Sequence, residues 1–365
     1  MSEEKIFDER LHAKNDEENT GLKWIEGYDL GLQGRPYIQP NYHRLTDEQI
    51  EIMKPVSEWV PYLSTNGAGL HIDFTTNSRK IDISYTLESS VHMPHMPITG
   101  SHGMDLYIKD TGKWEYYDSI IPEEKTDVYK SIVLEKLVPE GYNSFSLNLP
   151  LYQAVTSLKI GIEQDCEIKA DLLTKKPVVI YGTSITQGGC ASRPGMAYTN
   201  ILRRNIDRDV YNLGFSGSGK CEYEMTDILL TYDAEIFIFD PIPNLSNDKL
   251  SEDRYVHFYE KYREKYPNTP LILLDDPTFL YRYNTDSRQC PINETVQKHF
   301  NEWSKTDKNL YYIYKDELYG TDGEATVDRC HATDLGFMRM SKPVIKLVKK
   351  LTSKTSAGGK LNERF

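Results

Sequence analysis

The chain has 365 residues, of which 39% are hydrophobic and 27% charged, and its 55 acidic residues outnumber 43 basic ones. This length suggests two domains, and the composition is that of a globular protein rather than a disordered or membrane-embedded one. The net charge of −12 argues against a nucleic-acid-binding protein, because such proteins present positive charge to phosphates.

Neither a membrane segment nor a disulfide framework is expected. No apolar run approaches the roughly 20 residues needed to cross a bilayer, and the acidic start lacks the apolar stretch of a secretory signal. The five cysteines are scattered and form no C-x-x-C pair, which favours reduced thiols. We therefore expect a cytoplasmic protein that contacts neither membrane nor nucleic acid, with secretion as the alternative if a signal has been removed. Its oligomeric state, including a homo-oligomer, is left open.

Residues 1–172 predict an antiparallel β-sandwich. Short segments of alternating apolar and polar residues follow one another there, as in half-buried strands. These segments are 69–74, 81–85, 104–109, 113–117, 144–149 and 157–162. Asp110-Thr-Gly112 between two of them predicts a hairpin. The first 60 residues, which are polar and rich in Gly and Tyr, are predicted to wrap irregularly around the sandwich.

Residues 176–352, after a short linker at 171–176, predict a three-layer α/β/α domain. Near-continuous apolar runs indicate parallel strands that are covered on both faces. The predicted strands are 177–181, 210–213, 236–239, 271–274 and 310–314, and the predicted helices are 197–206, 221–230, 249–265, 292–305 and 335–351. Residues 353–365 are expected to be a frayed tail.

Polar residues of suggestive type follow the predicted strands. In parallel α/β sheets, active sites lie beyond the carboxyl ends of the strands. Ser184 follows the first strand on a Gly-containing turn, His331 lies in a polar loop after the last strand, and Asp328 precedes it by three positions. A hydroxyl nucleophile, a base and a carboxylate that orients the base are what acyl transfer requires.

Candidate oxyanion donors follow the first three strands. They are the Ser184 amide, the Gly217 N–H and the Asn244 carboxamide. Each of these residues also has a simple structural explanation, since serine and glycine are common in turns and Asn or Asp caps helices. Their order at successive strand ends favours the catalytic interpretation.

These residues resemble the four sequence blocks of the SGNH (GDSL-type) hydrolases. The blocks are Gly182-Thr-Ser184, Gly217, Asn244 and Asp328-x-x-His331. The strings 181–196 and 328–340 are similar to a bacterial branch whose catalytic domain follows a β-domain named for a Gly-x-Asp-Leu-Tyr motif, here Gly103–Tyr107. Two departures are Thr183, where the name-giving motif has Asp, and Pro241-Ile-Pro-Asn244 in place of Gly-x-Asn-Asp.

The resemblance spans residues 20–350 and implies a flavodoxin-like hydrolase domain without metal or organic cofactor. It implies that Ser184, His331 and Asp328 form a triad and that Ser184, Gly217 and Asn244 form the oxyanion hole. We expect a serine esterase that acts on short-chain acyl esters, with acetyl on a carbohydrate as the favoured substrate. A lipase is disfavoured, because the chain shows neither a long apolar lid nor an interfacial amphipathic helix.

Two further places are candidate substrate contacts. His92, His95 and His102 lie close together in the β-domain. A metal site there is disfavoured, because no acidic residue or Cys lies nearby at ligand spacing. The hypothesis is instead that this segment folds over the catalytic cleft and that His95 contacts substrate. Arg193 either binds a substrate oxyanion or holds its own loop by an ion pair.

Two alternatives from other functional classes remain. In a flavodoxin-like FMN-binding module, the hydroxyl-rich loop 181–187 would cradle a phosphate, but Asp328, His331 and Asn244 would then have no role. In a catalytically inactive carbohydrate-binding protein, the tyrosines of the β-domain would bind the glycan. The chain has 26 Tyr and only 11 Phe, which is compatible with a hydrated, aromatic binding surface.

Overall fold

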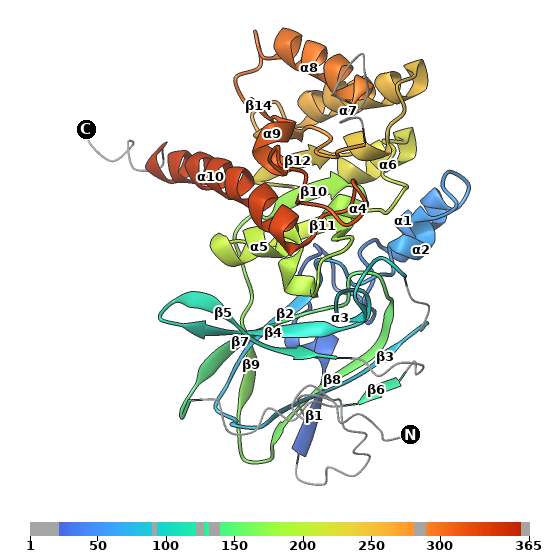
Figure 1. Cartoon of the computed structure of the whole chain (residues 1–365). Helices are drawn as coiled ribbons and strands as arrows, with labels where there is room; N and C mark the ends of the chain where they lie inside the picture. Colours follow the sequence, from blue (N-terminus) through green and yellow to red (C-terminus); the bar gives the residue numbers. More distant parts are fainter. Residues whose placement is uncertain (1–21, 90–92, 122–127, 131–138, 281–289, 359–365) are drawn as a thin grey trace, which may run out of the picture. The chain divides into compact units, whose positions relative to one another are not determined.

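The computed structural model describes residues 22–89, 93–121, 128–130, 139–280 and 290–358 (Figure 1). The chain folds as two units. Unit 1 comprises the described residues up to Arg44, residues 65–172 and residues 192–195. Unit 2 comprises residues 45–64, 173–191 and the described residues from Met196 onward. The chain passes from unit 1 to unit 2 at Leu172/Leu173, in the region of the predicted linker. The assignment of residues 45–64 to unit 2 and of residues 192–195 to unit 1 was not predicted.

Unit 1 is an antiparallel β-sandwich, as predicted. Its strands are β1 (Leu22–Glu26), β2 (His71–Thr76), β3 (Ile81–Leu87), β4 (Met104–Asp110), β5 (Lys113–Ile120), β6 (Val128–Lys130), β7 (Asn143–Asn148), β8 (Val155–Glu163) and β9 (Ile168–Ala170). They form a four-stranded sheet in the order β1-β8-β3-β6 and a five-stranded sheet in the order β5-β4-β7-β2-β9. Apolar side chains from both sheets share one buried cluster, which includes Phe74, Ile83, Phe145 and Ile160. Burial of this shared face stabilises the two-sheet arrangement.

The hairpin predicted at Asp110-Thr-Gly112 joins β4 to β5. Asp110 pairs with Lys113, and the two residues between them have φ values of 45° (Thr111) and 83° (Gly112). Positive φ at both central residues is typical of a two-residue type I′ turn, whose twist matches that of the flanking strands.

The prediction that the first 60 residues are irregular is wrong for part of the described chain. Strand β1 pairs with β8, and helices α1 (Asp47–Met53) and α2 (Val60–Leu63) follow. A capping box begins α1: the Thr46 side chain accepts from the Gln49 N–H, and the Gln49 side chain accepts from the Thr46 N–H. The spacing Thr-x-x-Gln before Ile50 was a readable helix signal.

Unit 2 is an α/β/α domain, as predicted. Its strands are β10 (Val178–Gly182), β11 (Val210–Gly214), β12 (Ile236–Asp240), β13 (Leu271–Leu274) and β14 (Leu310–Ile313). All of their pairings are parallel, in the order β11-β10-β12-β13-β14. This is the flavodoxin-like order, in which the strand sequence reverses next to the first strand and leaves a crevice there.

Helices cover both faces of this sheet (Figure 1). Besides α1 and α2 they are α4 (Ser184–Gln187), α5 (Tyr198–Asn205), α6 (Tyr223–Leu229), α7 (Lys249–Lys265), α8 (Pro291–Trp303), α9 (Lys315–Leu318) and α10 (Asp334–Gly358). Apolar residues of α1, α2, α6, α7 and α8 join one buried cluster with alternate sheet residues, which include Val179, Tyr181, Phe237 and Phe239. Helices α5 and α10 pack against each other, with Tyr198 stacked on Phe337.

The predicted tail begins within a helix, because α10 continues through Ser353 to Gly358. Among the described residues, no helix is both long and apolar enough to cross a membrane.

Candidate active site

Ser184 begins the one-turn helix α4 directly after the central strand β10. Thr183 has extended backbone geometry, and its hydroxyl accepts a hydrogen bond from the Ile185 N–H as the N-cap. Thr183 therefore fulfils a capping role at the position where the name-giving motif of the wider family has Asp. Gly188 ends the turn with a φ of 110°.

Two glycines, Gly214 at the end of β11 and Gly219 in the loop after it, allow this turn to approach closely. A Cβ on Gly219 would lie 2.1 Å from the Gly182 carbonyl oxygen, and one on Gly214 would lie 2.2 Å from the Gln187 nitrogen. The Phe215 N–H also donates to the Gly182 carbonyl oxygen at 3.0 Å. Backbone contact on this scale excludes any side chain larger than hydrogen, so the turn that carries Ser184 packs closely against its neighbour.

His331 lies in a short closed loop before α10. Thr326 and Ala332 form an isolated β-bridge, and the Val327 N–H donates to the His331 carbonyl oxygen at 2.9 Å. Within the loop, Asp328 Oδ1 accepts from the backbone N–H groups of Cys330 (3.0 Å) and His331 (2.7 Å). The carboxylate thus shapes the loop that carries the imidazole.

The structure brings Ser184, His331 and Asp328 together in one hydrogen-bonded chain. His331 Nδ1 lies 2.7 Å from Asp328 Oδ2, and His331 Nε2 lies 2.9 Å from Ser184 Oγ. Because an ionised carboxylate only accepts, the Nδ1 of a neutral imidazole carries the proton and Nε2 is left to accept from the serine hydroxyl. Both distances are within the range expected of a nucleophile, its base and the group that orients the base.

The surroundings of Asp328 favour its charged form. Partial burial raises the pKa of this carboxyl, but hydrogen bonds from the His331 imidazole and from two backbone N–H groups outweigh burial, and the net shift is downward. The Asp328 side chain is 38% exposed, which keeps the cost of its charge low. An ionised Asp328 can hold the imidazole in the tautomer just described.

The loops after β11 and β12 carry the predicted oxyanion donors. Gly217 has a φ of 66°, and its N–H donates no hydrogen bond among the described residues. Asn244 ends the short 3-10 helix η4 (Ile242–Asn244), and its Nδ2 donates to the Phe215 carbonyl oxygen at 3.3 Å. An amide nitrogen carries two protons, so one remains for a ligand. The oxyanion role of both residues stays a prediction.

Asp240 at the end of β12 is a buried acid for which the sequence suggested no role. Its Oδ2 accepts from Thr186 Oγ1 at 2.7 Å and from Tyr198 Oη at 2.9 Å, whereas its Oδ1 has no partner among the described residues. Burial raises the pKa of Asp240 to about 7, against the lowering effect of the two hydroxyls and with a further rise from Asp276. This network adjoins the turn that carries Ser184, because Thr186 belongs to the same turn.

Cys190 lies close to the triad within unit 2. Its Sγ and a ring nitrogen of His331 are within 4.8 Å of each other, and its φ is 74°. Burial, followed by the charge of Asp328, raises the pKa of the Cys190 thiol to about 12, so the thiol is neutral at physiological pH. Nothing in the spacing of the cysteines distinguished this one.

The histidines of the β-domain belong to unit 1. His102 is fully buried, and its two ring nitrogens are hydrogen-bonded to Ser101 Oγ (2.7 Å) and Gln153 Nε2 (3.1 Å), which gives it a structural role. His95 lies half-buried in a turn, and its contact with substrate stays a prediction. His92 lies outside the described residues.

Arg193 belongs to unit 1, where it forms an ion pair with Asp105 (2.7 Å) and a hydrogen bond to the Tyr107 hydroxyl. Asp105 and Tyr107 are both part of the Gly-x-Asp-Leu-Tyr motif. The ion-pair alternative for Arg193 therefore has a defined partner. Its contact with substrate stays a prediction.

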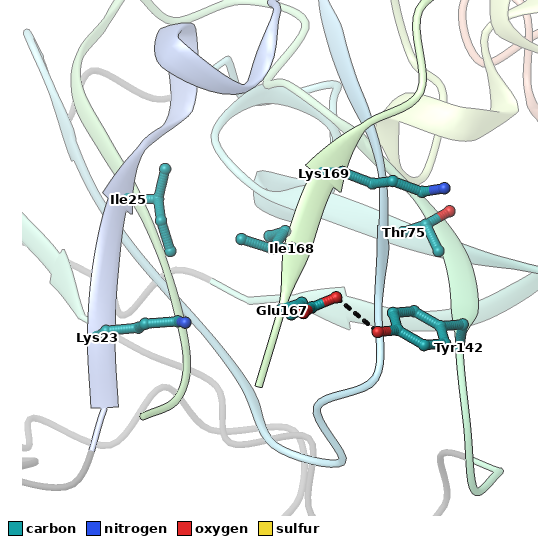
Figure 2. A pocket seen from close by; sticks show the side chains of 7 residues that line it. All are labelled: Lys23, Ile25, Thr75, Tyr142, Glu167, Ile168 and Lys169. Carbon is teal, nitrogen blue, oxygen red and sulfur yellow. Dashed lines mark hydrogen bonds between the residues drawn. The ribbon is translucent and has the colours of Figure 1, made fainter. Parts of the chain in front are cut away.

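Unit 1 also carries a pocket of about 450 Å³, shown in Figure 2. Lys23 and Ile25 on β1 and Ile168 and Lys169 on β9 line it, together with Thr75, Tyr142 and Glu167. The Tyr142 hydroxyl donates to Glu167 at 2.6 Å. None of the predicted site residues lines this pocket.

Comparison with known families identifies both parts of the chain. Residues 175–349 match the model of the GDSL-like lipase/acylhydrolase family. Residues 22–168 match the GxDLY model, which describes the N-terminus of SGNH-hydrolase-type esterases. Comparison with curated protein sequences finds no match.

Solved structures agree with these matches. A GDSL-like lipase from Bacteroides ovatus is 35% identical, with 91% of this chain and 98% of that chain covered and a TM-score of 0.82. The salicylyl-acyltransferase SsfX3 from a tetracycline biosynthetic pathway is 17% identical (95% and 100% covered, TM-score 0.73). An acetyl xylan esterase from Butyrivibrio proteoclasticus is 13% identical (91% and 100% covered, TM-score 0.55). The likeness to the last two shows the fold alone. The chain belongs to the GDSL-like lipase/acylhydrolase family and is an esterase of the SGNH type, with an N-terminal GxDLY domain.

Proposed function

We propose that the protein hydrolyses short-chain acyl esters, acetyl esters above all, on a carbohydrate alcohol, through an acyl-enzyme on Ser184. The observation that carries the proposal is the chain of hydrogen bonds Ser184 Oγ, His331 Nε2, His331 Nδ1 and Asp328 Oδ2, at 2.9 and 2.7 Å. The acetyl xylan esterase, which shares the fold, supports the choice of acyl group and alcohol.

The first half of the reaction forms the acyl-enzyme. His331 Nε2 accepts the hydroxyl proton of Ser184 as Oγ attacks the ester carbonyl, and Asp328 stabilises the imidazolium that results. The negative charge on the carbonyl oxygen is stabilised by the N–H groups of Ser184 and Gly217 and by the Asn244 amide. Loss of one such donor typically costs about 3–4 kcal/mol in the transition state. His331 then returns the proton to the leaving sugar alcohol.

The second half repeats these steps with water. His331 takes a proton from a water molecule, whose oxygen attacks the acyl carbon, and the proton finally returns to Ser184 Oγ as the acid leaves. Asp328 stays ionised throughout, consistent with the lowered pKa of its carboxyl. Ser184, His331, the leaving alcohol and one water molecule account for every proton transfer in the cycle.

The test compares p-nitrophenyl acetate, butyrate and octanoate, and an acetylated xylo-oligosaccharide, with the wild type and Ser184→Ala. We expect kcat/KM to fall as the acyl chain lengthens, and the variant to lose about 10⁴- to 10⁶-fold in kcat. Ser304→Ala, at the end of α8 in the same unit, serves as the matched control and should retain wild-type rates.

Two outcomes would contradict the proposal. A preference for octanoate would remove the short-chain assignment. Equal rates for wild type and Ser184→Ala would remove the mechanism. A yellow purified protein that stays unlabelled at Ser184 by a fluorophosphonate would instead favour the FMN-binding alternative.

A further inference from the structure

The Gly-x-Asp-Leu-Tyr motif on β4 holds a short segment of the chain that is distant in sequence, residues Ser192–Gly195, which we call the tethered segment. Asp105 is fully buried, and its Oδ2 accepts from Arg193 Nη1 (2.7 Å) and from the Gly195 N–H (2.8 Å). Its Oδ1 accepts from Asn148 Nδ2 at 2.8 Å. One buried carboxylate thus binds both a side chain and the backbone of the tethered segment.

One further motif residue, Tyr107, and its neighbour Tyr116 on β5 add contacts to the same segment. The Tyr107 hydroxyl accepts from Arg193, and a Cβ on Gly195 would lie 2.4 Å from that hydroxyl oxygen. The Arg193 guanidinium carbon lies 4.0 Å from the ring centroid of Tyr116 on β5, which adds a cation–π contact. Burial lowers the pKa of Arg193, but Asp105 and Tyr107 outweigh burial and raise it, so the guanidinium stays charged.

The anchorage reaches the start of the tethered segment as well. Thr99 Oγ1, in helix α3 (Ile98–Ser101), donates to the Ser192 carbonyl oxygen. Ser192, Arg193 and Gly195 are therefore all bound within unit 1. Directed contacts to three of its four residues restrict the conformations open to the segment.

The residues that flank the tethered segment belong to unit 2, and two of those that precede it are hydrogen-bonded to the Ser184 backbone. The Gly188 and Gly189 N–H groups donate to the Ser184 carbonyl oxygen at 3.0 and 2.8 Å. Cys190 places its Sγ within 4.8 Å of a His331 ring nitrogen while its own φ is 74°. A non-glycine residue with left-handed backbone geometry stores about 1–3 kcal/mol of strain and keeps this geometry only where its surroundings stabilise it.

We propose that Asp105 and Arg193 are positioning residues for the catalytic centre: by anchoring the tethered segment, the β-domain motif holds the preceding residues 188–191 against Ser184 and His331. The link is the covalent chain, since Ala191 of unit 2 is bonded to Ser192 of unit 1. The proposal rests on the proposed function of Ser184 and His331. It gives the name-giving motif of the β-domain a task in catalysis without contact with substrate.

The test measures kcat, KM and the rate of fluorophosphonate labelling at Ser184 in Asp105→Asn, Arg193→Ala, Arg193→Lys and Tyr107→Phe. We expect kcat and the labelling rate to fall together, about 10- to 100-fold in Asp105→Asn and Arg193→Ala, because a misplacement of about 1 Å costs up to that much. KM for p-nitrophenyl acetate should stay within about twofold, since uniform substrate binding is not affected. Arg193→Lys and Tyr107→Phe should lie between these variants and the wild type.

A second readout separates positioning from mere loss of stability. Guanidinium chloride at millimolar, non-denaturing concentration should restore part of kcat in Arg193→Ala and leave the wild type unchanged. Glu163→Gln is the matched control, because Glu163 is also a carboxylate of unit 1 that accepts from backbone and side-chain donors, at Arg79 and Ser78. Its Tm is expected to drop while its kcat stays at the wild-type level.

Three outcomes would overturn the inference. The first is that folded Asp105→Asn and Arg193→Ala keep kcat within twofold of the wild type. The second is that Glu163→Gln loses as much kcat as these variants do. The third is that only KM rises in Arg193→Ala, which would make Arg193 a substrate contact. If Asp105→Asn fails to fold, Arg193→Lys and Tyr107→Phe decide. If the proposed function itself is wrong, the wild type will not be labelled at Ser184, and this result distinguishes that failure from failure of the positioning inference.

Discussion

Two aspartates of unit 2 have opposite ionisation behaviour: Asp328 is linked to Ser184 through His331, and Asp240 is bonded to Thr186 in the Ser184 turn. Asp328 is 38% exposed and accepts three hydrogen bonds from N–H groups, and the net shift of its pKa is downward. Asp240 is fully buried and accepts only from two hydroxyls, and burial raises its pKa to about 7. N–H donors and partial exposure therefore keep the Asp328 carboxylate charged, whereas two hydroxyls do not offset the complete desolvation of Asp240.

Among the substitutions considered below, we expect replacement of Asp328 to lower kcat the most. Asp328→Asn retains the shape of the side chain but can no longer stabilise a positive imidazole or select its tautomer. We expect kcat to fall about 10⁴-fold with little change in KM. Steady-state kinetics on p-nitrophenyl acetate provide the measurement. A loss below tenfold would show that another group orients His331.

The matched control is Asp322→Asn. Asp322 is a half-exposed aspartate of the same unit, whose pKa is lowered to about 2, mainly by hydrogen bonding to Arg339. Because this ion pair has no part in the proposed mechanism, kcat should remain at the wild-type value.

The next effect concerns the loop that follows Asp240. Asn244→Ala removes an amide donor, and we expect kcat to fall about 10²- to 10³-fold. The same change removes the hydrogen bond to the Phe215 carbonyl oxygen, so Tm is measured in parallel. An unchanged kcat would show that Ser184 and Gly217 suffice as oxyanion donors. Asn205→Ala, at the end of α5, is the control for loss of a side-chain amide that bonds only to backbone.

Replacement of Asp240 should have the smallest effect on activity, and it tests the raised pKa of this carboxyl. Asp240→Asn should change kcat less than tenfold but alter the pH dependence of stability. Below pH 3.8 both folded and unfolded chains hold the proton. Between pH 3.8 and about 7 only the folded state holds it, so this group's contribution to stability is lost as pH rises through that window. The pKa difference corresponds to a loss of up to about 4 kcal/mol.

Thermal unfolding at pH 5 and pH 8 measures this change. The decrease in Tm over that interval should be smaller in Asp240→Asn than in the wild type. Part of the decrease should remain in the variant, because the pKa of the buried Asp276 is also raised. In Asp322→Asn the decrease should equal that of the wild type, because Asp322 titrates well below pH 5. Equal decreases in wild type and Asp240→Asn would contradict the ionisation behaviour described for Asp240.

Residue chemistry made much of the catalytic constellation predictable. Few residue types can act as nucleophile, base and orienting group, and Ser184 follows the first strand while Asp328 and His331 lie in the loop before the last helix, in the order that the family resemblance implies. The buried partner network was not predictable in the same way. Asp240 is an aspartate after an apolar strand, as Asp275 is, and only Thr186 and Tyr198, brought in from α4 and α5, distinguish it.

The sequence by itself determined the class of each half of the chain, because alternation and continuous apolar runs are local patterns that set which face of a strand is buried. It also identified the candidate triad. Only the tertiary structure decided the strand order β11-β10-β12-β13-β14, the transfer of residues 45–64 to unit 2 and of 192–195 to unit 1, and the pairing of Arg193 with Asp105. Each of these depends on contacts between residues far apart in the chain, about which local pattern carries no information.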